Sequence, residues 1–263
     1  MARTLPYLDH SLPIPVAHRG GDLHGIENTM PAFEHAVSLG FDYLETDVHV
    51  SSDGVLVAFH DADLERITGR PGTIADRTWD ELRSIDLGSA GSGSPAAADP
   101  GGASIPRLEE LLTAFPTTKF NIDPKVDAAV EPLGDVIEAL GAVDRVGIGA
   151  FDDARIAALQ ARFGPGLCTS PGPAELLTYL ASPTASAFET HGCLQIPPSF
   201  GEFSLTSEIL DAVHQMGLQV HVWTINEEQE MRRLLDLGVD ALMTDRVQLL
   251  KEVLVDRNEW KTP

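Results

Sequence analysis

Three short motifs near the start of the chain combine residue types that could cleave a phosphodiester. His18-Arg19-Gly20 is followed by Glu45-Thr46-Asp47 and then by His60-Asp61. Two imidazoles can serve as acid and base, because an unperturbed histidine pKa of about 6.5 lets one ring hold a proton while another lacks it. A guanidinium binds phosphate oxygens, and carboxylates bind a divalent cation. The set therefore predicts metal-assisted hydrolysis of a phosphodiester, with His18 and His60 as the proton-transfer groups.

Glu45 and Asp47 lie in a stretch, 43–50, in which apolar and polar residues alternate. In a strand, residues i and i+2 point to the same face, so the two carboxylates are expected to converge. Two such charges repel each other unless a cation lies between them, which favours a metal site. A lone Glu-x-Asp would more often be a solvated strand face, so the prediction depends on the neighbouring motifs. His49 shares this face and is interpreted as a wall residue.

Short apolar segments alternate with amphipathic ones along the chain, which is typical of an α/β fold with a parallel sheet. Strands are predicted over 14–17, 43–50, 120–122, 146–150, 167–169, 194–196, 219–223 and 241–243. Helices are predicted over 30–39, 130–140, 153–163, 174–180, 206–216, 227–237 and 247–255. Asn28 or Thr29 can cap the first helix, and Gly40 can end it. The eight strand–helix units predict a (β/α)8 TIM barrel, a fold that typically takes about 250 residues.

The regular alternation breaks between His60 and Leu108. Asp53-Gly54 separates two alternating runs and predicts a hairpin between the strand at 43–50 and a further strand at 55–59. A short helix is predicted over 79–85, and the stretch 88–102, rich in Gly, Ala, Ser and Pro, is predicted to be a loop. We interpret 62–105 as a small insertion after the second strand, within a single domain that spans 1–263.

Composition restricts the partners of the chain. Its 263 residues carry a formal net charge of −22, which argues against nucleic acid and against stable association with an anionic membrane. An anionic substrate is also repelled at long range, so Arg19, Lys125 and a metal would have to supply local positive charge. No signal peptide is visible and no apolar run approaches the ~20 residues that span a bilayer, so a cytoplasmic location is expected. Cys168 and Cys193 form no metal or disulfide motif and are expected to be reduced.

Further motifs follow in a consistent order along the chain. They are Glu27-Asn28-Thr29, the stretch 121–125 (Asn-Ile-Asp-Pro-Lys) and the stretch 222–226 (Val-Trp-Thr-Ile-Asn). With the three motifs above, they resemble the glycerophosphodiester phosphodiesterase family from about Val16 to Asp245. The resemblance implies a (β/α)8 barrel, a divalent cation, and hydrolysis of small glycerophosphodiesters to glycerol 3-phosphate and an alcohol.

The resemblance also implies which group performs which step. His60 would be the base on the attacking oxygen, and His18 the acid on the leaving alkoxide, although the residues alone leave that direction open. Arg19 would bind the phosphoryl oxygens through its planar fork, with a structural salt bridge as the competing interpretation. Lys125 would be a second contact to the phosphate.

The expected metal ligands are Glu45, Asp47 and Asp123. Asp123 stands where many relatives have Glu, which is one methylene longer, so a shifted metal or a bridging water would be needed there. Three carboxylates without a thiol favour a hard cation, Mg²⁺ or Ca²⁺, over zinc. The sequence does not determine which of the two cations is used, nor the oligomeric state.

Five more residues are expected to support the site. Glu27 is interpreted either as an outer metal ligand or as a group that orients His18 or Arg19. Asn28 is interpreted either as a helix cap or as a catalytic residue. Asp61 is expected either to orient a histidine ring or to fix the conformation of its loop. Trp223 and Phe151 are expected to form an apolar wall for the glycerol moiety or the alcohol, with a buried core position as the competing interpretation of the tryptophan.

Two other functions stay open at this stage. A phospholipase D-like enzyme of the spider-venom type would share the His, Glu-x-Asp and His arrangement and act on lysophospholipids, but no signal peptide or disulfide scaffold is visible. A non-catalytic barrel that binds phosphate esters is the second alternative. The intact set of His18, Arg19, Glu45, Asp47 and His60 argues against it, because a decayed enzyme is expected to lose at least one of them.

Overall fold

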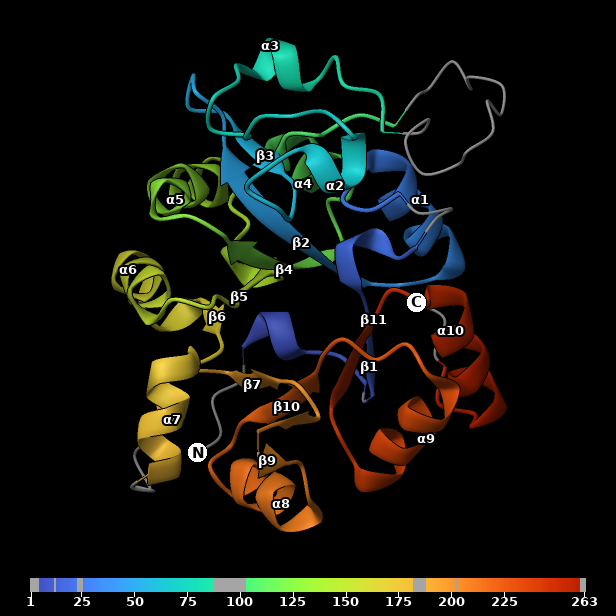
Figure 1. Ribbon diagram of the computed structural model, residues 1–263. Helices are drawn as coiled ribbons and strands as arrows, with labels where there is room; N and C mark the ends of the chain where they lie inside the picture. The colour runs from blue at the N-terminus through green and yellow to red at the C-terminus, as the bar shows by residue number, and fades with distance from the viewer. Residues whose placement is uncertain are drawn as a thin grey trace.

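Eight parallel strands form the centre of the molecule in the computed structural model, which describes residues 5–11, 13–22, 26–87, 103–181, 188–201 and 203–260. Figure 1 shows these strands surrounded by helices. The strands are β1 (Ile14–Ala17), β2 (Tyr43–Val50), β4 (Lys119–Pro124), β5 (Val146–Ile148), β6 (Cys168–Thr169), β7 (Cys193–Ile196), β10 (Gln219–Val222) and β11 (Ala241–Thr244). They follow the order β6-β5-β4-β2-β1-β11-β10-β7. The predicted α/β barrel of eight strands is confirmed.

The barrel is nearly, but not fully, closed by strand pairing. In the described residues β6 and β7 end the sheet and share no ladder. Other hydrogen bonds cross this gap, among them one from the Gly192 N–H to the Thr169 carbonyl at 3.0 Å and one from the Gln195 N–H to Ser170 Oγ at 2.9 Å. A two-residue strand such as β6 has too few backbone groups to pair fully on both edges, so side-chain and single backbone contacts complete the closure.

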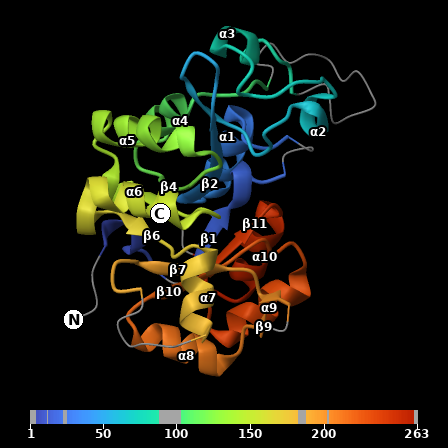
Figure 2. The ribbon, with the colours of Figure 1, turned by 60° about the vertical axis from the view of Figure 1, so that its left-hand side comes forward.

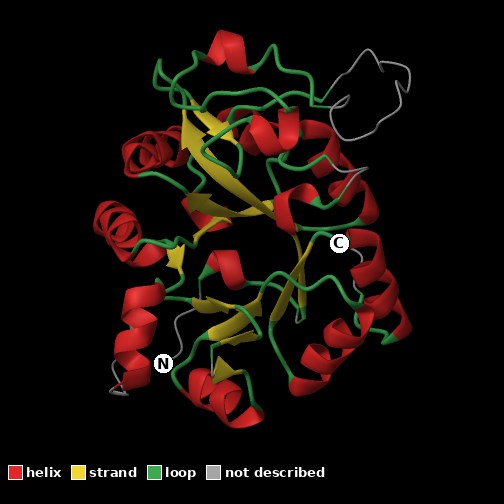
Figure 3. Cartoon of the chain, viewed as in Figure 1, coloured by secondary structure: helices red, strands yellow, loops and turns green. Residues whose placement is uncertain are grey.

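The helices cover the outside of the barrel, as Figures 2 and 3 show. They are α1 (Met30–Leu39), α4 (Leu108–Ala114), α5 (Val130–Ala139), α6 (Asp153–Phe163), α7 (Pro173–Ala181), α8 (Ser207–Gln215), α9 (Glu228–Leu237) and α10 (Val247–Asp256). The Thr29 hydroxyl caps α1 by accepting the Ala32 N–H, and Gly40 ends it in the left-handed region at φ 97°. Of the two predicted caps, therefore, Thr29 is the one used. Among the described residues, no helix is long and apolar enough to cross a membrane.

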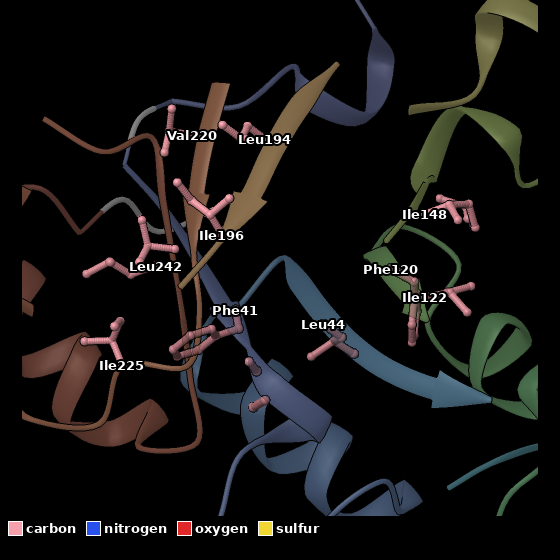
Figure 4. Close-up of a cluster of buried hydrophobic side chains, with 14 of the residues drawn as sticks. Phe41, Leu44, Phe120, Ile122, Ile148, Leu194, Ile196, Val220, Ile225 and Leu242 are labelled. Atoms are coloured by element: carbon pink, nitrogen blue, oxygen red, sulfur yellow. The ribbon is translucent and has the colours of Figure 1, made fainter. Parts of the chain in front are cut away.

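The main core lies between the strands and the helices. Alternate residues of β2 illustrate how strands contribute to it: Leu44 and Val48 are fully buried in this shell, whereas Glu45 and Asp47 belong to the other face. Figure 4 shows shell residues on opposite sides of the barrel, among them Phe120 on β4 and Val220 on β10. A smaller cluster fills the barrel interior, where Tyr7 from the N-terminal segment is packed with Tyr43.

The segment between β2 and α4, here called the excursion, has a small core of its own. β3 (Leu56–Ala58) pairs antiparallel with β2, as the Asp-Gly turn predicts. The short helices α2 (Glu65–Thr68) and α3 (Trp79–Leu82) follow, at the top of Figure 1. Buried apolar residues join these segments: Phe59, Leu64, Ile74, Leu82, Ile85, Leu87 and Ile105. The helix predicted over 79–85 ends at Leu82, and the predicted loop 88–102 lies outside the described residues.

Two α-helices and two short strands were not predicted. α2 and α4 lie in or directly after the irregular stretch, and they are only four and seven residues long, too short for a clear helical period. β8 (Ser199–Phe200) and β9 (Phe203–Ser204) form a two-residue antiparallel pair next to β7, with the Phe200 and Phe203 rings stacked 4.6 Å apart. Such short pairs leave no alternation for a pattern to detect.

Candidate active site

A cavity of about 500 Å³ opens where the barrel strands end. His18 follows β1, Lys125 follows β4 and Trp223 follows β10, so these side chains come from the carboxyl ends of different strands. This is the end of a TIM barrel at which catalytic groups gather. The predicted residues that line the cavity are His18, Arg19, Glu45, Asp47, His60, Asp123, Lys125, Phe151 and Trp223. The three supporting residues, Glu27, Asn28 and Asp61, lie behind them.

His18 is fixed by a carboxylate from the last strand–helix connection. Its Nδ1 lies 2.6 Å from Asp245 Oδ1, and Asn226 Nδ2 donates to the other oxygen of Asp245 at 2.7 Å. Since a carboxylate only accepts, Nδ1 carries the proton and Nε2 faces Glu45 Oε2 at 3.8 Å. Burial lowers the pKa of His18, but Glu45 and Asp245 outweigh this effect and raise it overall. The ring can therefore hold a proton near neutral pH.

His60 reaches the cavity by a hairpin. β3 runs back along β2, and the Phe59 N–H donates to the Asp47 carbonyl at 3.0 Å, which brings the next residue beside the carboxylates. His60 Nδ1 lies 2.6 Å from Asp61 Oδ1, so its Nε2 is left for chemistry. His49 Nε2 contacts the His60 carbonyl at 3.0 Å. His49 thus has a structural partner and does not line the cavity.

Lys125 joins two of the three predicted metal carboxylates. Its Nζ lies 2.7 Å from Asp47 Oδ1 and 2.7 Å from Asp123 Oδ2, and β2 and β4 place these two aspartates opposite each other in register. Although burial raises the pKa of Asp47, Lys125 and Arg19 hold it below its usual value. Burial raises the pKa of Asp123, and burial together with Asp47 raises the pKa of Glu45 to about 7.

These carboxylates fit a cation. Asp123 Oδ1 is buried without a hydrogen-bond partner, and burial raises the pKa of both Glu45 and Asp123, so a nearby positive charge would stabilise their carboxylate forms. Among the described residues, no three His, Cys, Asp or Glu side chains lie close enough to hold a metal as they stand, and the Lys125 ammonium lies between Asp47 and Asp123. The metal set of Glu45, Asp47 and Asp123 therefore stays a prediction.

Arg19 lies in an unusual backbone turn. Its φ of 54° is left-handed, and its N–H donates to Glu45 Oε2 at 3.0 Å. Gly20 follows at φ 83°, where a Cβ would lie 3.0 Å from the Phe33 backbone nitrogen, so only glycine fits. The guanidinium donates from Nη1 to Glu27 Oε1 at 2.9 Å, and its Nε lies 3.3 Å from Asp47 Oδ2. Glu27 thus contacts Arg19 rather than His18.

Asn28 orients a carboxylate and does not cap α1. Its Nδ2 donates to Asp47 Oδ2 at 3.1 Å, and its Oδ1 accepts from Thr46 Oγ1 at 2.7 Å. The residue is buried and has a φ of 54°, a conformation that asparagine tolerates better than most residues. Both ends of the amide are therefore used to hold β2 in place beside the cavity.

The opposite half of the cavity is apolar. The Phe151 and Trp223 rings meet edge to face at 5.6 Å, and Lys125 Nζ lies 5.8 Å from the Phe151 centroid. Phe151 is 64% exposed and Leu177 on α7 is 58% exposed, so large apolar side chains are accessible to solvent at the mouth of the cavity. Further apolar residues complete this wall: Leu176, Ile196, Pro197, Phe200 and Met243.

Sequence reasoning assigned no role to several of these residues. Asp245 and Asn226 hold His18, Arg66 contacts Glu27 and Asp61, and Leu176, Leu177 and Phe200 extend the apolar wall. Asp245 lies two residues after the predicted strand 241–243, and Asn226 ends the motif 222–226, so position in the sequence could have identified both. Arg66, Leu176, Leu177 and Phe200 lie on α2, α7 and β8, away from the ends of the barrel strands.

Similarity to known proteins extends over nearly the whole chain. The model of the glycerophosphoryl diester phosphodiesterase family matches residues 18–249. The chain is 37% identical to "Probable glycerophosphodiester phosphodiesterase 2" of Mycobacterium tuberculosis, over 98% of this chain and 97% of that protein. It is 30% identical to a human lysophospholipase D, over 91% of this chain and 85% of that protein.

Solved structures show the same fold. A glycerophosphodiester phosphodiesterase from Agrobacterium tumefaciens superposes with a TM-score of 0.73 at 23% identity, covering 92% of this chain and 100% of that one. A phosphodiesterase from Oleispira antarctica, solved with the product sn-glycerol-3-phosphate, has a TM-score of 0.72 at 24% identity, covering 93% and 97%. The fold, the match over most of the chain and the identity to these relatives lead to one conclusion. The chain belongs to the glycerophosphoryl diester phosphodiesterase family and is a phosphoric diester hydrolase.

Proposed function

We propose that the chain hydrolyses glycerophosphodiesters to glycerol 3-phosphate and an alcohol by acid–base catalysis between two histidines. One observation carries the proposal: His18 and His60 line the same cavity, and each has its Nδ1 held 2.6 Å from a carboxylate oxygen. Each ring is thereby oriented by Asp245 or Asp61, with Nε2 left for proton transfer. His18 follows β1 and His60 follows β3, and the proposal places the two rings on opposite sides of the phosphorus atom.

The proposed reaction follows from these positions. His60 Nε2 takes a proton from the attacking water, a bond forms from the water oxygen to phosphorus, and the bond from phosphorus to the leaving alkoxide breaks. His18 Nε2, whose pKa is raised by Glu45 and Asp245 against the effect of burial, gives its proton to that alkoxide. Arg19 and Lys125 bind the phosphoryl oxygens and neutralise their charge.

A divalent cation is part of the proposal. Enzymes of this family generally use one. Glu45, Asp47 and Asp123 would hold it, since Asp123 Oδ1 is buried without a partner and the pKa of Glu45 is raised to about 7 by burial and by Asp47. When bound, the cation would neutralise charge on the phosphoryl oxygens, and the oxygen ligands favour Mg²⁺ or Ca²⁺. Lys125 would then be released from Asp47 and Asp123 to contact the phosphate.

A lysophospholipid is the second candidate substrate, and the apolar wall favours it. Glycerol and choline are small and polar, whereas Phe151, Leu176, Leu177 and Phe200 offer apolar surface that an acyl chain could cover. A human relative at 30% identity is named for this activity. The chemistry would be unchanged, because the same phosphodiester bond to choline would break.

Turnover of two substrates distinguishes these functions. Glycerophosphocholine and lysophosphatidylcholine are each incubated with the protein in saturating Mg²⁺, Ca²⁺ or Mn²⁺, and choline and the phosphorylated product are quantified. The main proposal expects glycerol 3-phosphate from the first substrate at the higher kcat/KM. A higher value for the second substrate would favour the lysophospholipid, and no turnover of either would leave a barrel that only binds phosphate esters.

A matched pair of variants tests the apolar wall itself. Leu177→Ala removes an exposed side chain at the cavity, and Val255→Ala removes one of similar exposure, 52%, on α10. If acyl chains bind along the wall, Leu177→Ala should lower kcat/KM for lysophosphatidylcholine roughly 5-fold while glycerophosphocholine is unaffected. Equal effects of the two variants would remove the support for an acyl site.

A further inference from the structure

Arg66 in α2 contacts the carboxylate that holds Arg19 and the carboxylate that holds His60, although it does not line the cavity itself. Its Nε donates to Asp61 Oδ2, its Nη2 donates to Glu27 Oε1 at 2.6 Å, and its Nη1 approaches Glu27 Oε2 at 3.2 Å. One planar guanidinium thus holds two carboxylates that are 34 positions apart in the sequence. A bidentate contact of this kind fixes direction as well as distance.

The Glu27 side of this contact leads to the phosphate-binding group. Glu27 Oε1 accepts from Arg66 Nη2 and also from Arg19 Nη1, at 2.9 Å. Arg19 is largely buried at 16% side-chain exposure, and its Nε lies 3.3 Å from Asp47 Oδ2 without a hydrogen bond, so Glu27 is the carboxylate that holds its guanidinium by a hydrogen bond. The position of Glu27, and with it that of Arg19, therefore depends on Arg66.

The Asp61 side leads to the proposed base. Asp61 offers one oxygen to His60 Nδ1 at 2.6 Å and the other to Arg66 Nε. His60 is a third exposed and follows a short hairpin strand, so Asp61 is its main side-chain anchor. Arg66 thereby limits the rotation of the carboxylate that orients the imidazole.

The backbone of the insertion places Arg66. Leu64, two residues earlier, is fully buried in the small core of the excursion, and its N–H donates to the Gly72 carbonyl at 3.0 Å. The Thr68 N–H donates to the Leu64 carbonyl at 2.9 Å, which closes the single turn of α2. The stem of Arg66 is therefore fixed by the excursion, while its charged end reaches the barrel.

We propose that Arg66 is a positioning residue. Through it, the excursion after β2 fixes the position of the phosphate-binding Arg19 relative to that of the proposed base, His60. The inference rests on the proposed function, because it uses the roles assigned there to these two residues. Arg66 is half exposed, and an exposed ion pair adds little to stability, so its removal should leave the fold intact. Small displacements of a positioned catalytic group are costly to turnover, however.

The first experiment compares Arg66→Ala with Arg70→Ala in the metal-loaded protein. Arg70 is an exposed arginine of the same excursion. Its backbone N–H donates to Thr68 Oγ1 at 3.0 Å, but its guanidinium makes no ion pair or hydrogen bond with any residue in the described ranges. Both variants remove one positive charge. Arg66→Ala should raise KM for glycerophosphocholine about 5-fold and lower kcat about 10-fold, whereas Arg70→Ala should change neither by more than about 2-fold. Circular dichroism and thermal unfolding check that both variants are folded.

Double variants separate two series of contacts, here called branches: the Arg66–Glu27–Arg19 branch and the Arg66–Asp61–His60 branch. Glu27→Gln should mainly raise KM, and adding Arg66→Ala to it should lower kcat without raising KM further. Asp61→Asn should mainly lower kcat, and adding Arg66→Ala to it should raise KM without lowering kcat further. Such selective loss of additivity is the mark of a shared network. Fully additive effects on both parameters in both backgrounds would overturn the proposal, as would equal kinetics of Arg66→Ala and Arg70→Ala.

Arg66→Lys tests whether charge alone suffices. A lysine keeps the charge but presents one ammonium in place of a fork, so it should restore KM or kcat and not both. Full recovery of both parameters would contradict the bridging role.

The dissociation constant of inorganic phosphate, measured by calorimetry, separates this proposal from the proposed function. A wild-type protein that binds phosphate but turns over no diester would refute the function, and a 5-fold weaker phosphate affinity in Arg66→Ala, with Arg70→Ala unchanged, would still support the Arg66–Glu27–Arg19 branch. Unchanged phosphate affinity in Arg66→Ala would overturn it.

Discussion

At the residue scale, the two histidines share one arrangement. Each donates from Nδ1 to an aspartate at 2.6 Å, and each aspartate is held in turn by a nitrogen donor, from Asn226 or from Arg66. Such second contacts fix both the tautomer and the direction of the ring. The difference lies in exposure, because His18 is more deeply buried than His60.

Replacing either histidine should abolish most of the activity. His18→Ala or His60→Ala is expected to lower kcat by about 10²–10⁴, the usual range for loss of an acid or a base, with the fold intact. The measurement is kcat for glycerophosphocholine beside circular dichroism. His214→Ala serves as control, since its ring pairs with Asp240 away from the cavity. A folded double variant that keeps a rate near that of the wild type would rule out the assignment.

The pH profile should respond to Asp245. Burial lowers the pKa of His18, but Glu45 and Asp245 raise it overall. A general acid works when protonated, so activity is present below this pKa and is lost as the pH rises through it. Asp245→Asn removes one of the raising charges, and the alkaline limb of kcat/KM should therefore move to lower pH.

The control for this profile is Asp256→Asn, which removes a charge from an exposed partner of Arg232. Its alkaline limb should match that of the wild type. If the alkaline limb of kcat/KM in Asp245→Asn matches that of the wild type, or moves to higher pH, then the pKa of His18 does not determine that limb.

At the scale of elements, the N-terminal segment closes one end of the barrel. Tyr7 is buried against Gly147 of β5, and the Tyr43 hydroxyl donates to the Tyr7 carbonyl. A Cβ at Gly147 would lie 2.6 Å from the Tyr7 ring, which real contacts do not allow. The glycine thus permits the segment to lie under β5.

Gly147→Ala should therefore destabilise the protein. Overpacking of this kind costs about 1–3 kcal/mol, so the free energy of unfolding in urea should fall by that amount. Gly166→Ala is the matched control, because a Cβ there meets nothing within 4 Å. Equal stability of the two variants would mean that Tyr7 does not pack against β5 in solution.

Local patterns predicted most of the elements but not the contacts between distant ones. The alternation in 43–50 and the Asp-Gly turn predicted the β2–β3 hairpin, since both signals lie within a few residues. The partner of His18 lies 227 positions away, and only the closed barrel brings β1 and β11 side by side. The insertion of Lys125 between Asp47 and Asp123 likewise depends on the register of β2 against β4. The gap between β6 and β7 has no local signature at all.

At the scale of the whole molecule, charge opposes the proposed substrate. The chain has 18 Lys and Arg against 40 Asp and Glu, and several arginines, such as Arg162 and Arg257, are paired on the outer surface. Among the described residues that line the cavity, Arg19 and Lys125 are the lysine and arginine side chains. Capture of an anion must therefore depend on short-range contacts, because the long-range field is repulsive.

The dependence of kcat/KM on salt concentration should show the relative weight of long-range repulsion and of contacts inside the cavity. Long-range repulsion is screened beyond about 8–10 Å near physiological ionic strength, while contacts inside the cavity are screened much less. At saturating metal, kcat/KM for zwitterionic glycerophosphocholine should vary little with NaCl, and that for anionic glycerophosphoglycerol should rise modestly. A decrease for both substrates would mean that the local positive field dominates their capture.

Release of glycerol 3-phosphate by metal-stripped protein tests metal-assisted diester hydrolysis most directly. Protein treated with a chelator is mixed with glycerophosphocholine, and the product is quantified before and after Mg²⁺, Ca²⁺ or Mn²⁺ is added. We expect almost no glycerol 3-phosphate before addition and full turnover with at least one cation, with Glu45→Ala and Asp47→Ala needing more of that cation than the wild type. The same rate with the chelator present, or no glycerol 3-phosphate with any of the cations, would contradict the proposed reaction.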